Sequence, residues 1–232
     1  MSISPQLAEF KAGVQAELPL LVGVVPFGMI YGVLAVEAGL LPIEAQAMSA
    51  IVFAGSAQFI LTQLVSAGTP ALVMVLTAAI VNLRHALYSA SVAPYLRSLR
   101  PAWIFILAYL LTDEAYAVTI VHFTGSHSSS YHQRHYFLLG SGLALWSSWQ
   151  LSTAAGIFLG ALIPASWALD FTLPLIFIAL VVPRITTLAA GTAAITAGIV
   201  SIFALDTPYR LGLVAASLAG IMAGMLVEGR KA

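Results

Sequence analysis

Three charged residues stand inside stretches of the sequence that are otherwise almost wholly apolar. Arg84 ends a run of 39 uncharged residues, and Asp113 and Glu114 lie in the middle of the apolar run 101–121. A charged side chain near the centre of a bilayer costs at least about 2.5–3.5 kcal/mol, so it faces a partner or a wet cavity and commonly marks a path for protons or ions. We therefore predict a proton-coupling site or ion pair formed by Arg84, His85, Asp113 and Glu114.

The depth of Arg84 in the membrane decides between this interpretation and simpler ones. Arg84 lies roughly 14 residues into its span and Asp113 roughly 12 residues into the next, so their heights differ by one or two turns at about 1.5 Å per residue. Arg84, Tyr88 and Ser91 share a helical face, as do Asp113 and Tyr116. Asp113 is the expected partner of Arg84, with Glu114 as the next candidate. Two alternatives stay open: Arg84 extends to the lipid headgroups, or the pair only braces the helices.

The apolar segment 44–67 carries polar side chains on opposite helical faces. Ser49, Ser56 and Gln63 recur every seven residues, whereas Gln58 lies on nearly the opposite face. A helix that faces lipid does not carry polar groups on both sides, so this segment is either buried all round or broken near its glycine. Close packing of helices would also explain the pattern, but we favour a substrate site. The residues predicted to line it are Gly55, Ser56, Gln58 and Phe59.

The first apolar run, 18–36, contains a proline in its interior. Proline inside a helix frees a backbone carbonyl, and broken helices supply such groups at the midplane of transporters. A simple kink is the alternative. Asn82 lies beside Arg84 on a second polar stripe of its span. The predicted substrate site is completed by Pro26, Phe27, Gly28 and Asn82.

The composition explains why these residues must act inside a membrane. Of the 232 residues, 60% are apolar and 8% are charged, and the formal net charge is zero. A soluble domain is about a quarter charged, so the chain is predicted to be an all-α polytopic membrane protein that uses the lipid bilayer as its solvent. A neutral chain has no basic face for nucleic acid. With no cysteine and no hydrolase, zincin or phosphate-loop motif, it is not expected to be an enzyme.

Eight apolar segments follow one another as one transport domain, 1–232. They are 18–36, two segments between 44 and 84 divided at Gly68–Pro70, 101–121, 136–163, 167–182, 185–205 and 211–227. They form two weakly repeated halves, 13–122 and 136–228, around a polar loop at 123–135. Because His122, His127, His132 and His135 fit no strong ligand spacing, we expect a solvated loop there, with no metal site and no cofactor.

The distribution of Lys and Arg favours an inverted arrangement of the two halves. If segments 44–67 and 167–183 are re-entrant or broken helices, six basic residues lie in the cytoplasm and two outside. The six are Lys11, Arg97, Arg100, Arg184, Arg230 and Lys231, and the two are Arg134 and Arg210. If all eight segments span, the bias falls to five against three. The length of 44–67, which suffices for a spanning helix, keeps that second model open.

Several of these motifs, in this order, resemble the AzlC-like branched-chain amino acid permeases. The resemblance rests on residues 23–28, 48–59, 81–88, 112–117 and 169–174 and on a stripe of Trp146, Trp149 and Thr153. It implies a multi-pass protein of the bacterial inner membrane, the large subunit of an exporter of valine, leucine and isoleucine. It also implies a partner, a small AzlD-like membrane subunit.

An amino acid substrate requires a donor for its carboxylate and an acceptor for its ammonium group. We expect broken-helix termini near Gly28 and Gly55 to supply both, and Phe27 and Phe59 to form an apolar pocket for an aliphatic side chain. Export is expected to be proton-coupled. The alternatives are a channel-like or assembly subunit without active transport, and a transporter of other small amino acids.

Overall fold

The computed structural model describes residues 4–125, 133–160, 185–204 and 211–229, together with Val182 and Thr207. These residues form helices joined by turns, without a strand among them. The chain is an all-α membrane protein, as the sequence predicts: α1 and the stretch Ala71–Leu96 are each long and apolar enough to cross a bilayer. The helices are α1 (Pro5–Glu37), α2 (Pro42–Val52), α3 (Gly55–Ser66), α4 (Ala71–Val81), α5 (Leu83–Leu96), α6 (Pro101–Leu110), α7 (Asp113–Thr124), α8 (His135–Gly160), α10 (Leu188–Phe203) and α11 (Leu211–Glu228).

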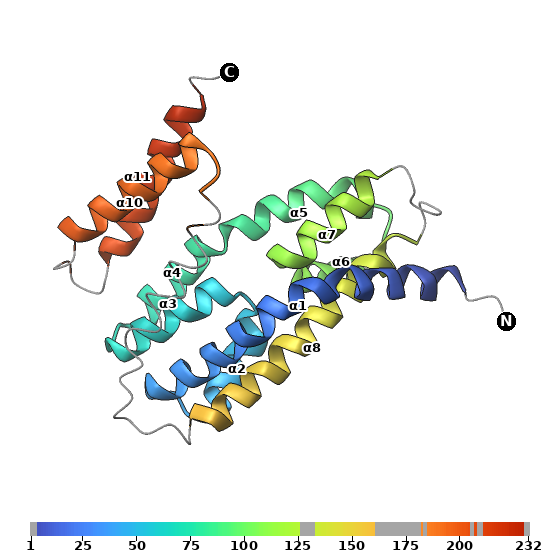
Figure 1. Ribbon diagram of the computed structural model, residues 1–232, viewed down its shortest axis with the longest axis horizontal. Helices are drawn as coiled ribbons and strands as arrows, with labels where there is room; N and C mark the ends of the chain where they lie inside the picture. Colours follow the sequence, from blue (N-terminus) through green and yellow to red (C-terminus); the bar gives the residue numbers. More distant parts are fainter. Residues whose placement is uncertain are drawn as a thin grey trace. The chain divides into compact units, whose positions relative to one another are not determined.

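The chain groups into two compact units. The first comprises Met1–Ser66 and Ala78–Leu162, and the second comprises Ala67–Thr77 and Ile163–Ala232. In the second unit, α10 and α11 pack as an antiparallel pair (Figure 1). Small residues allow this close approach, since a Cβ atom added to Gly220 would lie 2.8 Å from the carbonyl oxygen of Ala193. The predicted re-entrant segment 167–183 falls outside the described residues, except for Val182.

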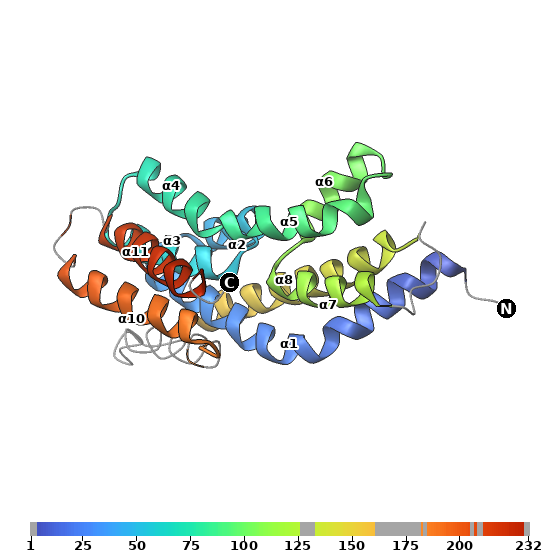
Figure 2. The ribbon, with the colours of Figure 1, turned by 90° about the horizontal axis from the view of Figure 1, so that it is seen from above.

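The spine of the first unit is the pair α1 and α8, which run side by side in the same direction (Figure 2). Glycines on both helices bring the two backbones together. A Cβ atom on Gly13 would lie 2.1 Å from the carbonyl oxygen of Phe137, and one on Gly156 would lie 2.0 Å from that of Met29. Substitution of either glycine would therefore push the two helices apart.

Two chain segments of the first unit are broken rather than continuous helices, and a third helix is interrupted at a single residue. Two non-helical residues, Phe53 and Ala54, separate α2 from α3, as the broken-helix prediction for 44–67 expects. Asn82 interrupts the path from α4 to α5, and Leu111 and Thr112 separate α6 from α7. The unbroken span predicted for 101–121 is therefore wrong. Its sequence does carry a helix-start signal, because Asp113 and Glu114 fall in the first turn of α7.

The break predicted near Gly28 is also wrong. Helix α1 is continuous over Pro5–Glu37, with Pro19 and Pro26 in its interior. Gly28 serves packing instead, because a Cβ atom there would lie 2.1 Å from Ser152 Oγ on α8. Contact along the whole length of α8 holds α1 together, although each proline removes a backbone hydrogen bond.

The ends of the polar loop at 123–135 are more ordered than a solvated loop. Phe123 and Thr124 still belong to α7, and Arg134 is buried. Its guanidinium donates a hydrogen bond of 3.1 Å to the carbonyl oxygen of Phe123. A cation at a helix C-terminus satisfies carbonyls that have no partner in the helix, which accounts for the burial of this charge.

Candidate functional site

An ion pair joins the starts of two of the broken helices. Arg84, the second residue of α5, pairs with Asp113, the first residue of α7. Arg84 Nη2 also donates a hydrogen bond of 2.7 Å to Ser56 Oγ, on the second residue of α3. His85 Nε2 lies 3.6 Å from Asp113 Oδ1. The expected pairing of Arg84 with Asp113 is present. Ser56, which the sequence analysis assigned only to the substrate site, also binds Arg84.

Packing between α5 and α7 holds this pair in register. The rings of Tyr88 and Tyr116 stack with centroids 4.5 Å apart, and the hydroxyls of Ser91 and Tyr116 lie 3.0 Å apart. The face of α5 that carries Arg84, Tyr88 and Ser91 therefore packs against the face of α7 that carries Asp113 and Tyr116. The side chains of Arg84 and Asp113 are 31% and 28% exposed, so the pair is partly open rather than sealed in the core.

The charges at the helix starts favour this arrangement in part. The N-terminus of a helix carries a partial positive charge, which stabilises a carboxylate there by about 0.3–1 kcal/mol. Asp113 gains from this at the start of α7. Arg84 stands near the start of α5, where a cation is disfavoured, and its pairing with Asp113 offsets that cost. The N-termini of α3, α5 and α7 are thus gathered around one cation and one anion.

The break between α2 and α3 is held by Gln58. Its Oε1 accepts a hydrogen bond of 3.2 Å from the backbone N–H of Ala54, and its carbonyl oxygen accepts one of 2.8 Å from Thr62 Oγ1. Phe53 ends α2 in the left-handed region at φ 39°, a conformation that costs on the order of 1–3 kcal/mol for a residue with a side chain. Such strain at a break is typical of functional positions.

Several buried polar atoms around the cluster have no hydrogen-bond partner in the described part of the chain. They include the donor Gln58 Nε2 and the acceptors Asn82 Oδ1 and Thr112 Oγ1. An unpaired buried polar group costs about 1–3 kcal/mol. These atoms are therefore suited to bind a polar ligand, and two of them, on Gln58 and Asn82, belong to residues predicted to bind substrate.

The aromatic residues of the predicted site pack against one another. The rings of Phe27 and Phe59 lie 4.5 Å apart, and Trp149 and Tyr31 complete the group. Gly55 rests on them, since a Cβ atom there would lie 3.1 Å from both Phe27 and Trp149. Pro26, by contrast, is exposed on the other side of α1. Phe27, Phe59 and Gly55 are thus brought together, Gly28 lies against α8 beside Trp149, and Pro26 lies apart from the group.

The polar stripe of α8 serves contacts to α2 and α6. Gln46 Nε2 donates a hydrogen bond of 2.7 Å to Gln150 Oε1, and the hydroxyls of Ser49 and Thr153 lie 3.0 Å apart. Trp146 Nε1 donates a bond of 2.7 Å to the hydroxyl of Tyr109. The bonds to Gln46 and Ser49 hold the half-helix α2 against α8, and in this way they fix the position of the break.

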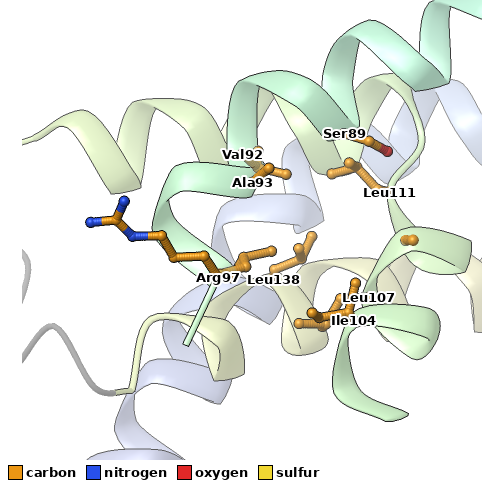
Figure 3. Close-up of a pocket in the computed structure, with 10 residues that line it drawn as sticks. Ser89, Val92, Ala93, Arg97, Ile104, Leu107, Leu111 and Leu138 are labelled. Carbon is orange, nitrogen blue, oxygen red and sulfur yellow. The ribbon is translucent and has the colours of Figure 1, made fainter. Parts of the chain in front are cut away.

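An apolar pocket of about 230 Å³ lies between α5 and α6, with Leu138 of α8 at its wall (Figure 3). Ser89 follows Arg84 by five residues, about 7.5 Å along α5 but on a nearly opposite face of the helix, and Leu111 precedes Asp113 by two residues. The sequence analysis did not predict this pocket. The remaining lining residues are Val92, Ala93, Leu96, Arg97, Ile104, Leu107 and Ala108.

Two acidic residues of α1 were missed as candidates. Glu17 is fully buried and Glu9 is 5% exposed. Glu9 Oε2 lies 2.9 Å from His122 Nε2 on α7. Glu17 interacts electrostatically with Glu114, which is also on α7. Their spacing of eight residues could have indicated a shared helical face, but only the packing of α1 on α7 shows that the face is buried.

Comparison with known proteins places the chain in a family. The model of the AzlC protein family matches residues 19–163. The inner membrane protein YgaZ of Escherichia coli (strain K12) is 27% identical over 229 residues, which cover 96% of this chain and 91% of that protein. An uncharacterized membrane protein of Archaeoglobus fulgidus is 32% identical over 218 residues, covering 92% and 93% respectively. No solved structure matches. With well over half of its length matched by the family model, and with membrane proteins as its relatives, the chain belongs to the AzlC protein family.

Proposed function

We propose that this protein is the large subunit of a secondary transporter that exports valine, leucine and isoleucine in exchange for protons. The observation that carries the proposal is the meeting of the starts of α3, α5 and α7 at the Arg84–Asp113 pair. Transporters place their substrate and ion sites where broken helices leave backbone groups and helix termini free. Membership of the AzlC family supports a transporter-type subunit in a membrane.

The polar atoms of the cluster suit the two charges of an amino acid. The substrate carboxylate would be held by the free N–H groups at the start of α3 and by Gln58 Nε2. The ammonium group would donate to Asn82 Oδ1 and Thr112 Oγ1, which are unpaired acceptors. The aliphatic side chain of the substrate would bind in the apolar pocket between α5 and α6, whose lining is almost entirely apolar.

Asp113 is the carboxylate that we assign to proton coupling. When it is ionised, it holds Arg84 at the starts of α5 and α7. When it takes up a proton, it loses its charge, and Arg84 keeps its hydrogen bond to Ser56 Oγ but loses its ionic partner, so the cation is free to turn toward the substrate carboxylate. The pair is then a switch whose two arrangements differ by one proton.

The partner and the location belong to the same proposal. Large apolar side chains such as Val75, Phe105 and Phe203 are exposed on several helices and need lipid or a partner subunit. We assign one such face to a small AzlD-like membrane subunit. The name of the Escherichia coli relative supports an inner-membrane location. The two helices in the described part of this chain that are long and apolar enough to cross a bilayer support more than one span.

Transport by purified protein in liposomes tests the proposal. Vesicles with and without the small subunit are loaded with leucine, and a pH gradient is imposed or omitted. We expect movement of leucine against its concentration gradient only when the pH gradient is present, with lysine as a control substrate that is not moved. Equilibration without accumulation would indicate a channel, and no flux in either preparation would indicate an assembly subunit; either result would refute the proposal.

A further inference from the structure

Helices α1 and α7 pack in opposite directions and bring two pairs of titratable residues together. One pair is Glu9 with His122, 2.9 Å apart. The other is Glu17 with Glu114, which interact electrostatically. Glu17 follows Glu9 by eight residues and Glu114 precedes His122 by eight, so the two pairs lie about 12 Å apart along the helices. Glu114 also interacts electrostatically with Asp113 and Arg84, so the second pair lies next to the ion pair without being part of it.

The carboxyl group of Glu17 has no compensation for its burial. It is fully buried, and neither of its oxygens has a hydrogen-bond partner in the described part of the chain. Helix α7 carries Glu114, which interacts with Glu17, and also Asp113, Tyr116 and His122, the last of which pairs with Glu9. Helix α5 offers Arg84, which is paired with Asp113, and His85. Helix α3 has no titratable residue, and α8 has none after Tyr136.

An ionised carboxylate in such surroundings is strongly disfavoured. Transfer of a charged group into a protein interior without a counter-ion or hydrogen bond costs so much that the group becomes neutral instead. A second carboxyl group close by adds repulsion, and two such groups commonly hold one proton between them. Glu114 is half-buried and stands one residue from Asp113, so a proton held there is next to the ion pair.

We infer that the buried carboxyl group of Glu17 holds a proton beside Glu114, and that the two residues form a second proton-binding site, distinct from Asp113 and next to the Arg84–Asp113 pair. The site lies at the interface of α1 and α7, between the Glu9–His122 pair and the start of α7. Its use in transport rests on the proposed function; the binding of the proton does not.

Infrared spectroscopy of the purified full-length chain, without substrate, tests the inference directly. A protonated carboxyl group buried in a protein has a carbonyl stretching band that shifts in D₂O, and its intensity is followed as the pH is changed. We expect this band in the wild type and its loss in Glu17→Gln. In Glu114→Gln the band should titrate at a different pH, because the neighbouring carboxyl group is gone. The matched control is Glu37→Gln, at the exposed end of the same helix, which should leave the band unchanged.

A band that survives in Glu17→Gln would overturn the inference, as would identical titration of the wild type and Glu114→Gln. Should Glu17→Gln fail to fold, Glu114→Gln decides alone, because it leaves Glu17 in place. The spectra require neither transport nor the small subunit. A wild type that shows the band but no pH-driven export would therefore refute the proposed function and leave the proton site standing.

Discussion

The pairing of Arg84 with Asp113 can be measured by a double-mutant cycle. Removing one partner of a fully buried ion pair costs about 3–5 kcal/mol, whereas an exposed pair contributes about 0.2–1 kcal/mol. With side chains 31% and 28% exposed, the pair falls between these limits, so Arg84→Ala should destabilise the protein by about 2 kcal/mol. In a chain of this length that lowers Tm by about 4–8 °C.

The double variant separates a true pair from two independent residues. Arg84→Ala with Asp113→Ala leaves neither charge without a partner, so it should be at least about 1 kcal/mol more stable than the sum of the single effects predicts. The cycle is completed by measuring the Tm of the wild type, the two single variants and the double variant in detergent, with the loss of folded protein on heating monitored by size-exclusion chromatography. Arg100→Ala, an exposed arginine at the start of α6, is the control and should be additive with Asp113→Ala. Additivity of the Arg84 and Asp113 effects would refute the pairing.

The same residues separate stability from coupling. Asp113→Asn keeps the size of the side chain and removes its negative charge, so it imitates the protonated state. We expect this variant to bind leucine and to exchange leucine for leucine across the membrane, while pH-driven accumulation is lost. Accumulation that still follows the pH gradient in Asp113→Asn would exclude Asp113 as the coupling group and make Glu114 the next candidate.

The remaining predictions concern the break, the topology and the partner. Gly55→Leu should abolish transport, because a side chain there meets Phe27 and Trp149 at 3.1 Å. The control Gly23→Leu, with nothing within 4 Å of the added Cβ atom, should keep its transport activity. Equal transport activity of the two variants in liposomes would show that the break serves only packing. Cysteines placed at the exposed positions Ser98 and Thr124 should label from the cytoplasmic and the outer face respectively, and labelling of both from one side would contradict the charge-bias topology. Co-expression of the small subunit should raise the yield and the efflux activity of this chain. Full activity of the lone chain in liposomes would refute that dependence.

The composition and the positions of a few polar residues determined the class of protein and part of the site. A chain that is 60% apolar and 8% charged has too little polar surface for water, whatever its fold. Arg84 and Asp113 were predictable as partners because a charge in lipid is so costly that few arrangements tolerate it. The break near Gly55 was predictable for a similar reason, since polar groups on opposite faces of one helix cannot all avoid lipid.

Only the tertiary structure decided which helices stay whole and which residues of different helices meet. The sequence of α1 contains Pro26 and Gly28 and resembles a broken helix, yet contact with α8 keeps it continuous. The run 101–121 reads as one apolar span, yet it breaks before Asp113. Glu17 precedes the first apolar run, where a charge is expected to meet water, and its burial beside α7 follows from the packing of α1 on α7. Local patterns report the preferences of neighbouring residues, whereas these outcomes depend on contacts between residues roughly a hundred positions apart.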